Sequence, residues 1–186
     1  MLSVELEETR ILELMATGAP IRAHMMQLDE TAVDLLVESF VAHYRREREG
    51  LARPFPGMTS LLRGLRADGI RVAVVTSKLR DDTLAELSAT GLDEHVEVVI
   101  AFEDTDEHKP AAAPHLEALR RLGASGGVGV GDLPGDVLSA RAAGLDALAV
   151  SWGYGDPAVL REAGAELVCE TPEELAQALQ GRVVEH

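Results

Sequence analysis

The sequence predicts an α/β protein in which helices cover both faces of a parallel sheet, with a small all-α segment at the N-terminus. Two observations support this class. From residue 58 onward, short apolar runs alternate with helical patterns, as expected for parallel strands that are buried on both faces. Residues 1–50 carry only the spacing of helices. We therefore expect a helical part at 1–52 and an α/β core at 53–186.

The helical part contains one long apolar stripe at the i, i+3, i+4, i+7 spacing of a helix. Its members are Val33, Leu36, Val37, Phe40, Val41 and Tyr44. They predict a helix over about 31–48 that ends at Gly50. Two shorter helices are expected before it, one closing near Gly18 and one over 19–27. The segment LARPFPG at 51–57 then reads as a connector, because it holds two prolines and a glycine.

The core alternates helices with apolar, β-branched runs. The helix that begins at Met58 should stop at Gly69, and further helices are predicted at about 80–90, 113–122, 135–143, 157–163 and 172–180. The predicted strands are Ile70–Val75, Val96–Ile100, Val128–Val130, Ala147–Val150 and Leu167–Cys169. Asp156-Pro157 and Thr171-Pro-Glu-Glu174 are helix-start signals for the last two helices.

The composition is that of a globular protein, with 46% hydrophobic and 26% charged residues among 186. Asp and Glu number 32 against 17 Lys and Arg, a formal net charge of −15 that disfavours binding to nucleic acids or anionic membranes. Because the N-terminus is acidic and no apolar run is long enough to span a bilayer, we predict a cytoplasmic protein. The single cysteine, Cys169, excludes an internal disulfide.

Polar residues follow three of the predicted strands. They are Thr76, Ser77 and Lys78 after the first strand, Lys109 beyond the second, and Asp132 and Asp136 after the third. Ligands bind at the carboxyl ends of parallel strands, so these side chains should gather at one edge of the sheet. Hydroxyl, ammonium and carboxylate groups together suit a phosphate accompanied by a divalent cation.

Each residue also has a purely structural interpretation. Thr76 and Ser77 are of a type that often forms turns or caps helices, and a lone lysine such as Lys109 is usually solvated. Asp132 is placed to cap the next helix, and Asp136 falls in its first turn, where the helix dipole favours an acid. Their joint occurrence at successive strand ends favours a functional interpretation, because capping does not predict it.

Other patterns are interpreted as structural. Gly127-Val-Gly129-Val-Gly131 has the letters of a nucleotide-binding loop, but its valines alternate at strand spacing and the next helix starts only after Pro134. Asp104-Thr-Asp106 is a carboxylate pair, which we expect on solvated backbone in the loop before Lys109. His108 is expected to be an exposed loop histidine.

Three segments together resemble the haloacid dehalogenase (HAD) superfamily. Val74-Val-Thr-Ser-Lys78, Glu103 to Pro110, and Gly131-Asp132 through Gly144 look like its second, third and fourth motifs. Trp152-Gly-Tyr154 and Gly164-Ala165 look like the tail of its phosphoglycolate phosphatase and pyrophosphatase-like branch. The resemblance implies a Rossmann-like core over 53–186, with residues 1–52 as part of a helical cap.

The resemblance also implies a Mg²⁺-dependent phosphohydrolase of small phosphorylated metabolites that works through an aspartyl-phosphate. Thr76 and Lys109 would be its catalytic contacts to the phosphoryl group. Ser77 and Lys78 would bind the substrate.

The two acids after the third strand would serve the metal. Asp132 would be a direct ligand of Mg²⁺, and Asp136 would help through water or by holding Lys109. Because halide displacement needs no hard cation, this pair favours a phosphatase over a dehalogenase.

One part of the family pattern is absent. No Asp-x-Asp-Gly-Thr motif occurs in the sequence, so these 186 residues lack the nucleophile and are expected to be inactive as they stand. The strand that carries the motif would lie between the Thr76 strand and the Asp132 strand, whose edges would stay unpaired. Three hypotheses follow: an N-terminally truncated phosphohydrolase, a non-catalytic binding or interaction protein, and a chain that obtains the strand from a partner, as in a homodimer.

Overall fold

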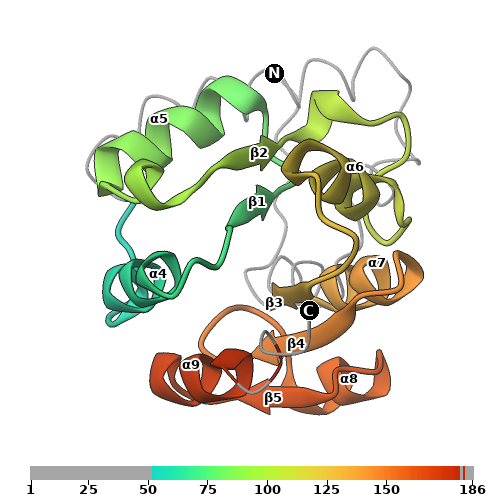
Figure 1. The fold of residues 1–186 in the computed structure, drawn as a ribbon. Helices are drawn as coiled ribbons and strands as arrows, with labels where there is room; N and C mark the ends of the chain where they lie inside the picture. Colours follow the sequence, from blue (N-terminus) through green and yellow to red (C-terminus); the bar gives the residue numbers. More distant parts are fainter. Residues whose placement is uncertain (1–51, 181, 183–186) are drawn as a thin grey trace, which may run out of the picture.

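The computed structural model describes residues 52–180 and 182, in which helices and strands alternate (Figure 1). The helices expected within residues 1–50 lie outside the described residues. The order is α4 (Met58–Ala67), β1 (Ala73–Val75), α5 (Arg80–Thr90), η2 (Asp93–His95), β2 (Val98–Ile100), η3 (Phe102–Asp104), α6 (Ala113–Leu122), β3 (Val128–Gly131), α7 (Pro134–Ala142), β4 (Asp146–Val150), α8 (Pro157–Glu162), β5 (Leu167–Cys169) and α9 (Pro172–Gln180). The predicted α/β class is confirmed.

All described strand pairs are parallel, but they form two sheets instead of the one expected. β1 pairs with β2, and β3, β4 and β5 pair in that order. Within the described residues no strand joins β1 to β3. The division falls between the Thr76 strand and the Asp132 strand, where the family resemblance implies unpaired edges.

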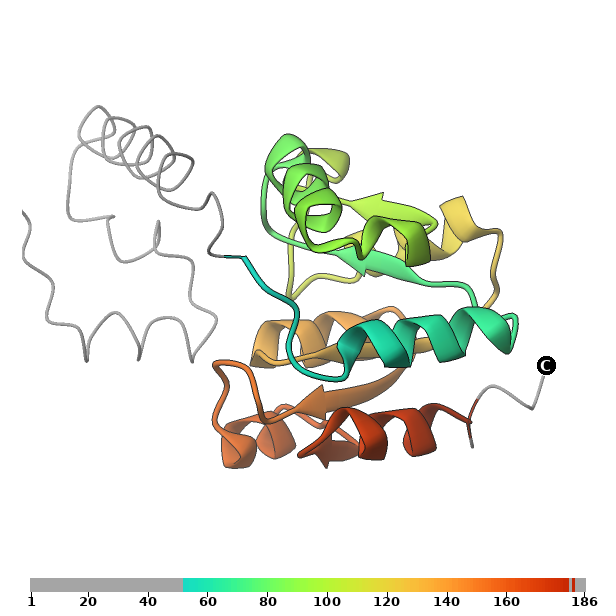
Figure 2. The same ribbon diagram turned by 90° about the vertical axis from the view of Figure 1, so that its left-hand side faces the viewer.

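Helices cover both faces of the three-stranded sheet. On one face, leucines of α4 and α9 pack with Leu148 and Val150 of β4 and with Cys169 of β5. On the other face, α7 and α8 pack against Ala147 and Ala149 of the same strand. Figure 2 shows α4 lying beside α9. The first and the last described helices are therefore neighbours in the structure.

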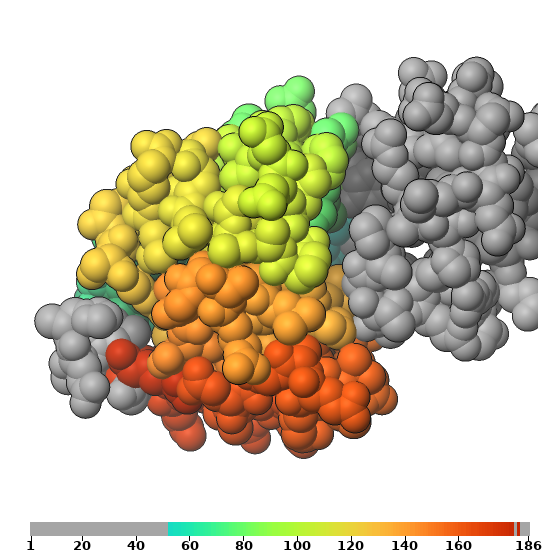
Figure 3. Space-filling model, turned by 90° about the vertical axis from the view of Figure 1, so that its right-hand side faces the viewer, coloured from blue at the N-terminus to red at the C-terminus, as the bar shows by residue number. Residues whose placement is uncertain are grey.

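Helix α6 connects the two sheets. It packs against β1 and β2 and also against α7, which in turn covers β3 and β4. Figure 3 shows the yellow and yellow-green segment around η3 and α6 in contact with the orange surface of α7. The α6–α7 contact therefore ties the two sheets together on this face.

The glycines of β3 let α7 approach the strand closely. A Cβ added to Gly129 would overlap the Cβ of Ala140, and one added to Gly131 would overlap the side chain of Asp136. The pattern Gly127-Val-Gly129-Val-Gly131 is thus a strand that packs on a helix, as predicted. It is not a loop that cradles a nucleotide.

Helix ends follow the predicted signals closely. Asp156 Oδ1 accepts hydrogen bonds from the backbone N–H groups of Ala158 and Val159 at the start of α8. Thr171 Oγ1 accepts from Glu174 N–H, although the Glu174 carboxylate turns to Glu170 N–H and not to the cap residue itself. Gly91 and Gly123 end α5 and α6 in the left-handed conformation, with φ of 68° and 64°.

The first two strands are shorter than predicted. β1 begins at Ala73 and not at Ile70, because Ile70 N–H bonds to the carbonyl of Leu65 and so still belongs to the end of α4. None of the helices in the described part of the chain is long and apolar enough to cross a bilayer.

Gly129→Ala should lower the free energy of unfolding by about 1–3 kcal/mol, since the new methyl group must displace α7 from β3. Gly127→Ala is the matched control, because no atom lies within 4 Å of a Cβ at that position. Urea denaturation should show equal or higher stability for the control. Equal stabilities for both variants would contradict the close packing of β3 on α7.

Candidate active site

Lys109 contacts both the carboxyl end of β1 and Asp136, the predicted site residue after β3. Its ammonium group donates to the Val75 carbonyl at 3.2 Å and to Asp136 Oδ1 at 2.6 Å. The two side chains of this ion pair are only 16% and 15% exposed. The loop after β2 therefore places one cation between the end of β1 and the start of α7.

Asp136 is fully engaged by the protein. Its Oδ1 holds Lys109, and its Oδ2 accepts from Leu133 N–H at 3.1 Å, which caps the first turn of α7. Two roles were predicted for Asp136, namely helping to bind Mg²⁺ through water and holding Lys109. Its contacts agree with the second role. The capping interpretation is also correct for this residue, so one carboxylate does both.

Asp132 is not a helix cap. Its Oδ2 accepts from Tyr154 N–H at 2.9 Å, in the loop that follows β4. A Cβ at Gly153 would overlap the Asp132 carboxylate, and one at Gly155 would overlap its backbone carbonyl. The glycines of Trp152-Gly-Tyr-Gly155 are thus required for this loop to close over Asp132, a role that the spacing Gly-x-Gly could have suggested.

Thr76, Ser77 and Lys78 form the turn after β1. Thr76 N–H donates to Ile100 of β2, while its Oγ1 accepts from Lys78 N–H at 3.1 Å. Ser77 is exposed. The Lys78 ammonium pairs with Glu86 of α5 at 2.5 Å, so the two predicted site lysines are held by different partners.

Of the two acids predicted to serve Mg²⁺, Asp132 is the one whose carboxylate suits the ion. Among the described residues, no three His, Cys, Asp or Glu side chains gather as a metal site. Asp132 supplies the hard oxygen that this ion prefers. Asp136 is committed to Lys109 and to the α7 cap. A complete magnesium site would therefore need further oxygen ligands besides Asp132.

The rarity of lysine in this sequence is a signal that points to the candidate site. Lysine occurs at only positions 78 and 109, whereas every other basic residue among the 17 Lys and Arg is arginine. An ammonium group is a compact charge that suits a phosphate oxygen, and the planar guanidinium group suits extended ion pairs. Both lysines lie at the carboxyl edge of the first sheet.

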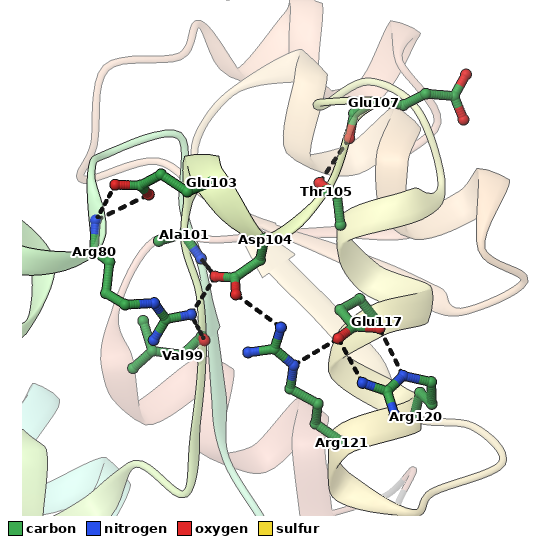
Figure 4. Close-up of polar contacts among 10 residues, drawn as sticks. All are labelled: Arg80, Val99, Ala101, Glu103, Asp104, Thr105, Glu107, Glu117, Arg120 and Arg121. Carbon is green, nitrogen blue, oxygen red and sulfur yellow. Dashed lines mark hydrogen bonds and ion pairs between the residues drawn. The ribbon is translucent and has the colours of Figure 1, made fainter.

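Asp104 is largely enclosed and ion-paired, which corrects the expectation of a solvated loop acid (Figure 4). Its side chain is 10% exposed and contacts the guanidinium groups of Arg80 and Arg121. Burial raises the pKa of Asp104, but hydrogen bonds from Ala101 N–H and from both arginines outweigh it and lower the pKa. Asp104 therefore fastens η3 to α5 and α6, and so fixes the loop that leads to Lys109.

The same cluster extends along α6 (Figure 4). Arg120 and Arg121 both donate to Glu117, which lowers the pKa of that carboxyl to about 2. On the other side, Arg80 also donates to the carbonyl of Val99 at 3.1 Å. The ion pairs and hydrogen bonds beside α5 and α6 in this cluster are thus made by arginines.

His108 is more enclosed than the exposed ring that the sequence predicts, and a second histidine, His115, is buried. His108 stacks on Phe102 with ring centroids 3.9 Å apart, so it is part of the packed loop beside Lys109. His115 is buried in α6, and its Nδ1 lies 2.8 Å from Ser139 Oγ in α7. The Ser139 hydroxyl donates to the Ala111 carbonyl, so Nδ1 must carry the proton that it shares with Ser139.

Parallel strands that alternate with helices define a Rossmann-like α/β fold, in which ligands bind at the carboxyl ends of the strands. The chain belongs to the haloacid dehalogenase-like hydrolase family, whose sequence model matches residues 3–150.

Individual relatives agree with this assignment. The plasmid-encoded phosphoglycolate phosphatase of Cupriavidus necator is 36% identical over 145 residues, which cover 77% of this chain and 63% of that protein. Pyrophosphatase PpaX of Halalkalibacterium halodurans is 27% identical over 160 residues, 85% of this chain and 74% of that protein. A hydrolase from Pseudomonas syringae has the same fold, with a TM-score of 0.82 at 24% identity over 96% of this chain and 84% of its own.

Asp104→Asn should lower the free energy of unfolding by about 1–2 kcal/mol, because two partly exposed arginines lose their shared carboxylate. Asp106→Asn, at an exposed position two residues away, is the control and should change stability by less than about 0.5 kcal/mol. Thermal and urea denaturation of both variants provide the comparison. Similar unfolding free energies for the two variants would contradict a stabilising role of the Asp104 ion pairs.

Stability should fall as the pH drops below about 6.5, in part because of His115. Burial lowers the pKa of His115, the Lys109 charge lowers it further, and Asp136 opposes this only in part. The unfolded chain therefore takes up a proton at a higher pH than the folded chain. Urea unfolding between pH 7.5 and 5.5 should show a smaller loss for His115→Gln than for the wild type, and equal losses would refute this role.

Proposed function

We propose that this chain carries the phosphate-binding and metal-binding part of a Mg²⁺-dependent phosphohydrolase that acts on small phosphorylated metabolites. Membership of the hydrolase family supports the reaction class. The relatives named phosphoglycolate phosphatase and pyrophosphatase support a substrate with a phosphoric ester or anhydride bond. The chain spans 63% of the first of these relatives, so the activity of a complete enzyme is part of the proposal.

The observation that carries the proposal is the Lys109–Asp136 pair. Burying the charge of a lysine whose side chain is only 16% exposed normally costs free energy. Here the Asp136 carboxylate and the Val75 carbonyl accept hydrogen bonds from its ammonium group at the sheet edge. The group keeps one N–H that these two contacts do not use. That N–H is available for an oxygen of a phosphoryl group, whose charge the ammonium would stabilise.

Neighbouring residues complete the proposed site. Thr76 at the end of β1 would donate its hydroxyl to a second phosphoryl oxygen, and the exposed Ser77 and Lys78 would contact the rest of the substrate. Asp132 would bind Mg²⁺, which neutralises phosphoryl charge when it is present. Asp136 would act as a positioning residue, because it touches Lys109 and not the substrate.

The proposed reaction needs an aspartate nucleophile that the family motif would supply. An aspartate oxygen would form a bond to phosphorus as the bond to the leaving oxygen breaks, and water would then hydrolyse the aspartyl-phosphate. No Asp-x-Asp-Gly-Thr motif is present to supply that aspartate. We therefore propose that the 186-residue chain binds phosphate but does not turn over.

A second candidate is a non-catalytic binding protein with the same pocket. The absent motif favours it as much as it favours an incomplete enzyme. The two differ in what happens when the missing carboxylate is supplied: an enzyme gains turnover, whereas a binding protein gains none.

The experiment measures binding of inorganic phosphate to the purified 186-residue chain by calorimetry, with and without Mg²⁺. We expect Mg²⁺-dependent binding, which Lys109→Met weakens by about tenfold or more, the equivalent of ~1.4 kcal/mol. Lys78→Met is the matched variant and should weaken binding less, since Lys78 is paired with Glu86 in α5.

Hydrolysis of p-nitrophenyl phosphate is measured in parallel. No turnover is expected from the wild-type chain. Phosphate binding that is unchanged by Lys109→Met would sink the proposed site, and turnover by the chain alone would show that a different residue serves as nucleophile.

A further inference from the structure

Helix α7 holds the loop of Lys109 at two points. Asp136, in the first turn of α7, accepts a hydrogen bond from the ammonium group of Lys109 at 2.6 Å. Ser139 Oγ, one turn later, donates to the carbonyl of Ala111 at 2.6 Å. Residues three positions apart lie on the same face of a helix. One face of α7 therefore contacts both the tip of the Lys109 side chain and the backbone just beyond this residue.

His115 of α6 orients the Ser139 hydroxyl. Its Nδ1 lies 2.8 Å from Ser139 Oγ. A hydroxyl has a single proton, and Ser139 gives this proton to the Ala111 carbonyl, so His115 Nδ1–H is the donor in the second contact. Three groups thus form a hydrogen-bond chain that runs from His115 through Ser139 to the Ala111 carbonyl.

Burial makes the members of this chain depend on one another. Ser139 is fully buried and His115 is 8% exposed. A buried N–H or carbonyl that loses its partner stays unsatisfied, which costs more free energy than the bond contributes. Apolar side chains would pack two helices together without this risk, but their attraction has no direction. A satisfied polar chain fixes one orientation of the groups that it joins.

The surroundings of His115 hold its ring in place. Burial lowers the pKa of His115, and the charge of Lys109 lowers it further, while Asp136 acts in the opposite direction. The ring is therefore neutral at pH 7, and its one N–H is the one that Ser139 accepts. The other nitrogen lies near β3, since a Cβ added to Gly129 would come within 3.5 Å of His115 Nε2.

We propose that His115 and Ser139 are positioning residues for Lys109. Lysine has a long flexible stem, so the place of its ammonium group depends on where its backbone is held. By fixing the Ala111 carbonyl against α7, the hydrogen-bond chain sets the origin of the side chain whose tip Asp136 receives. The proposal rests on the proposed role of Lys109 in phosphate binding, and it extends that role to two residues that act through Lys109 and not on the substrate.

The first measurement reads Lys109 directly by NMR. The chain holds only two lysines, at positions 78 and 109, so ¹³C labelling of lysine Cε gives two side-chain signals, which Lys109→Met assigns. Ser139→Ala removes one hydroxyl and little volume. We expect this variant to shift the Lys109 signal and to lower its order parameter, because the backbone beside Lys109 has lost its contact with α7. This measurement needs no phosphate.

The second measurement is calorimetric titration with inorganic phosphate in the presence of Mg²⁺. Ser139→Ala should weaken phosphate binding by about threefold or more. The matched control is Thr83→Val, which removes another buried hydroxyl that donates to a backbone carbonyl, that of Leu79 beside α5. Both variants should lower the melting temperature. The control should leave the phosphate affinity and the Lys109 signal unchanged.

Two variants of His115 test the donor at the start of the chain. In asparagine, Nδ2 is bonded to Cγ as Nδ1 is in histidine, so His115→Asn keeps an N–H for Ser139, whereas His115→Leu removes it. We expect His115→Asn to stay closer to the wild type in both measurements. His115→Leu combined with Ser139→Ala should weaken phosphate binding by no more than the stronger single variant, since both break the same chain.

Four results would overturn the proposal: an unchanged Lys109 signal in Ser139→Ala, unchanged phosphate affinity in that variant although the wild type binds, equal effects of Thr83→Val, and equal effects of the two His115 variants. A wild-type chain that binds no phosphate would sink the proposed function alone, and a Lys109 signal that Ser139→Ala still shifts would then uphold the positioning role. If Ser139→Ala fails to fold, the two His115 variants decide the same question.

Discussion

The contact of Lys109 with the carbonyl of Val75 and the carboxylate of Asp136 holds the carboxyl edge together. Among the described residues the two sheets share no strand pairing, and at this edge the Lys109 ammonium group contacts both sides. A largely buried charge is costly unless it is paired and hydrogen-bonded, and here Lys109 has one partner from each sheet region. Near this edge, α6 and α7 are also joined by the His115–Ser139 contact and by the hydrogen bond from Ser139 to the Ala111 carbonyl.

Local signals in the sequence predicted the elements well, and long-range pairing was beyond their reach. The helices at 80–90, 113–122 and 172–180 agree with α5, α6 and α9, because periodicity, caps and glycine stops are properties of neighbouring residues. The partners of Asp104 were not predictable, since Arg80 and Arg121 are 24 and 17 positions away. The division of the sheet was expected only through the family resemblance, because strand order is not encoded in apolar runs.

The net negative charge of the chain does not describe the charges around the candidate site, where several acids are ion-paired. Three acids around the site form ion pairs: Asp104 with two arginines, Glu86 with Lys78, and Asp136 with Lys109. Asp132 differs, since a backbone N–H is the partner recorded for it among the described residues. The net charge of −15 is therefore partly offset at this edge, because three of its carboxylates are paired with cationic side chains.

The bond from Arg80 to the carbonyl of Val99 has a consequence for solubility. Val99 faces the outer edge of β2, where an exposed strand would otherwise offer its backbone to another molecule. A further strand could join there only by displacing the guanidinium group and breaking its contact with Asp104. The protein therefore resists edge-to-edge polymerisation along β2, and this protection is built from the same arginine that fastens α5 to η3.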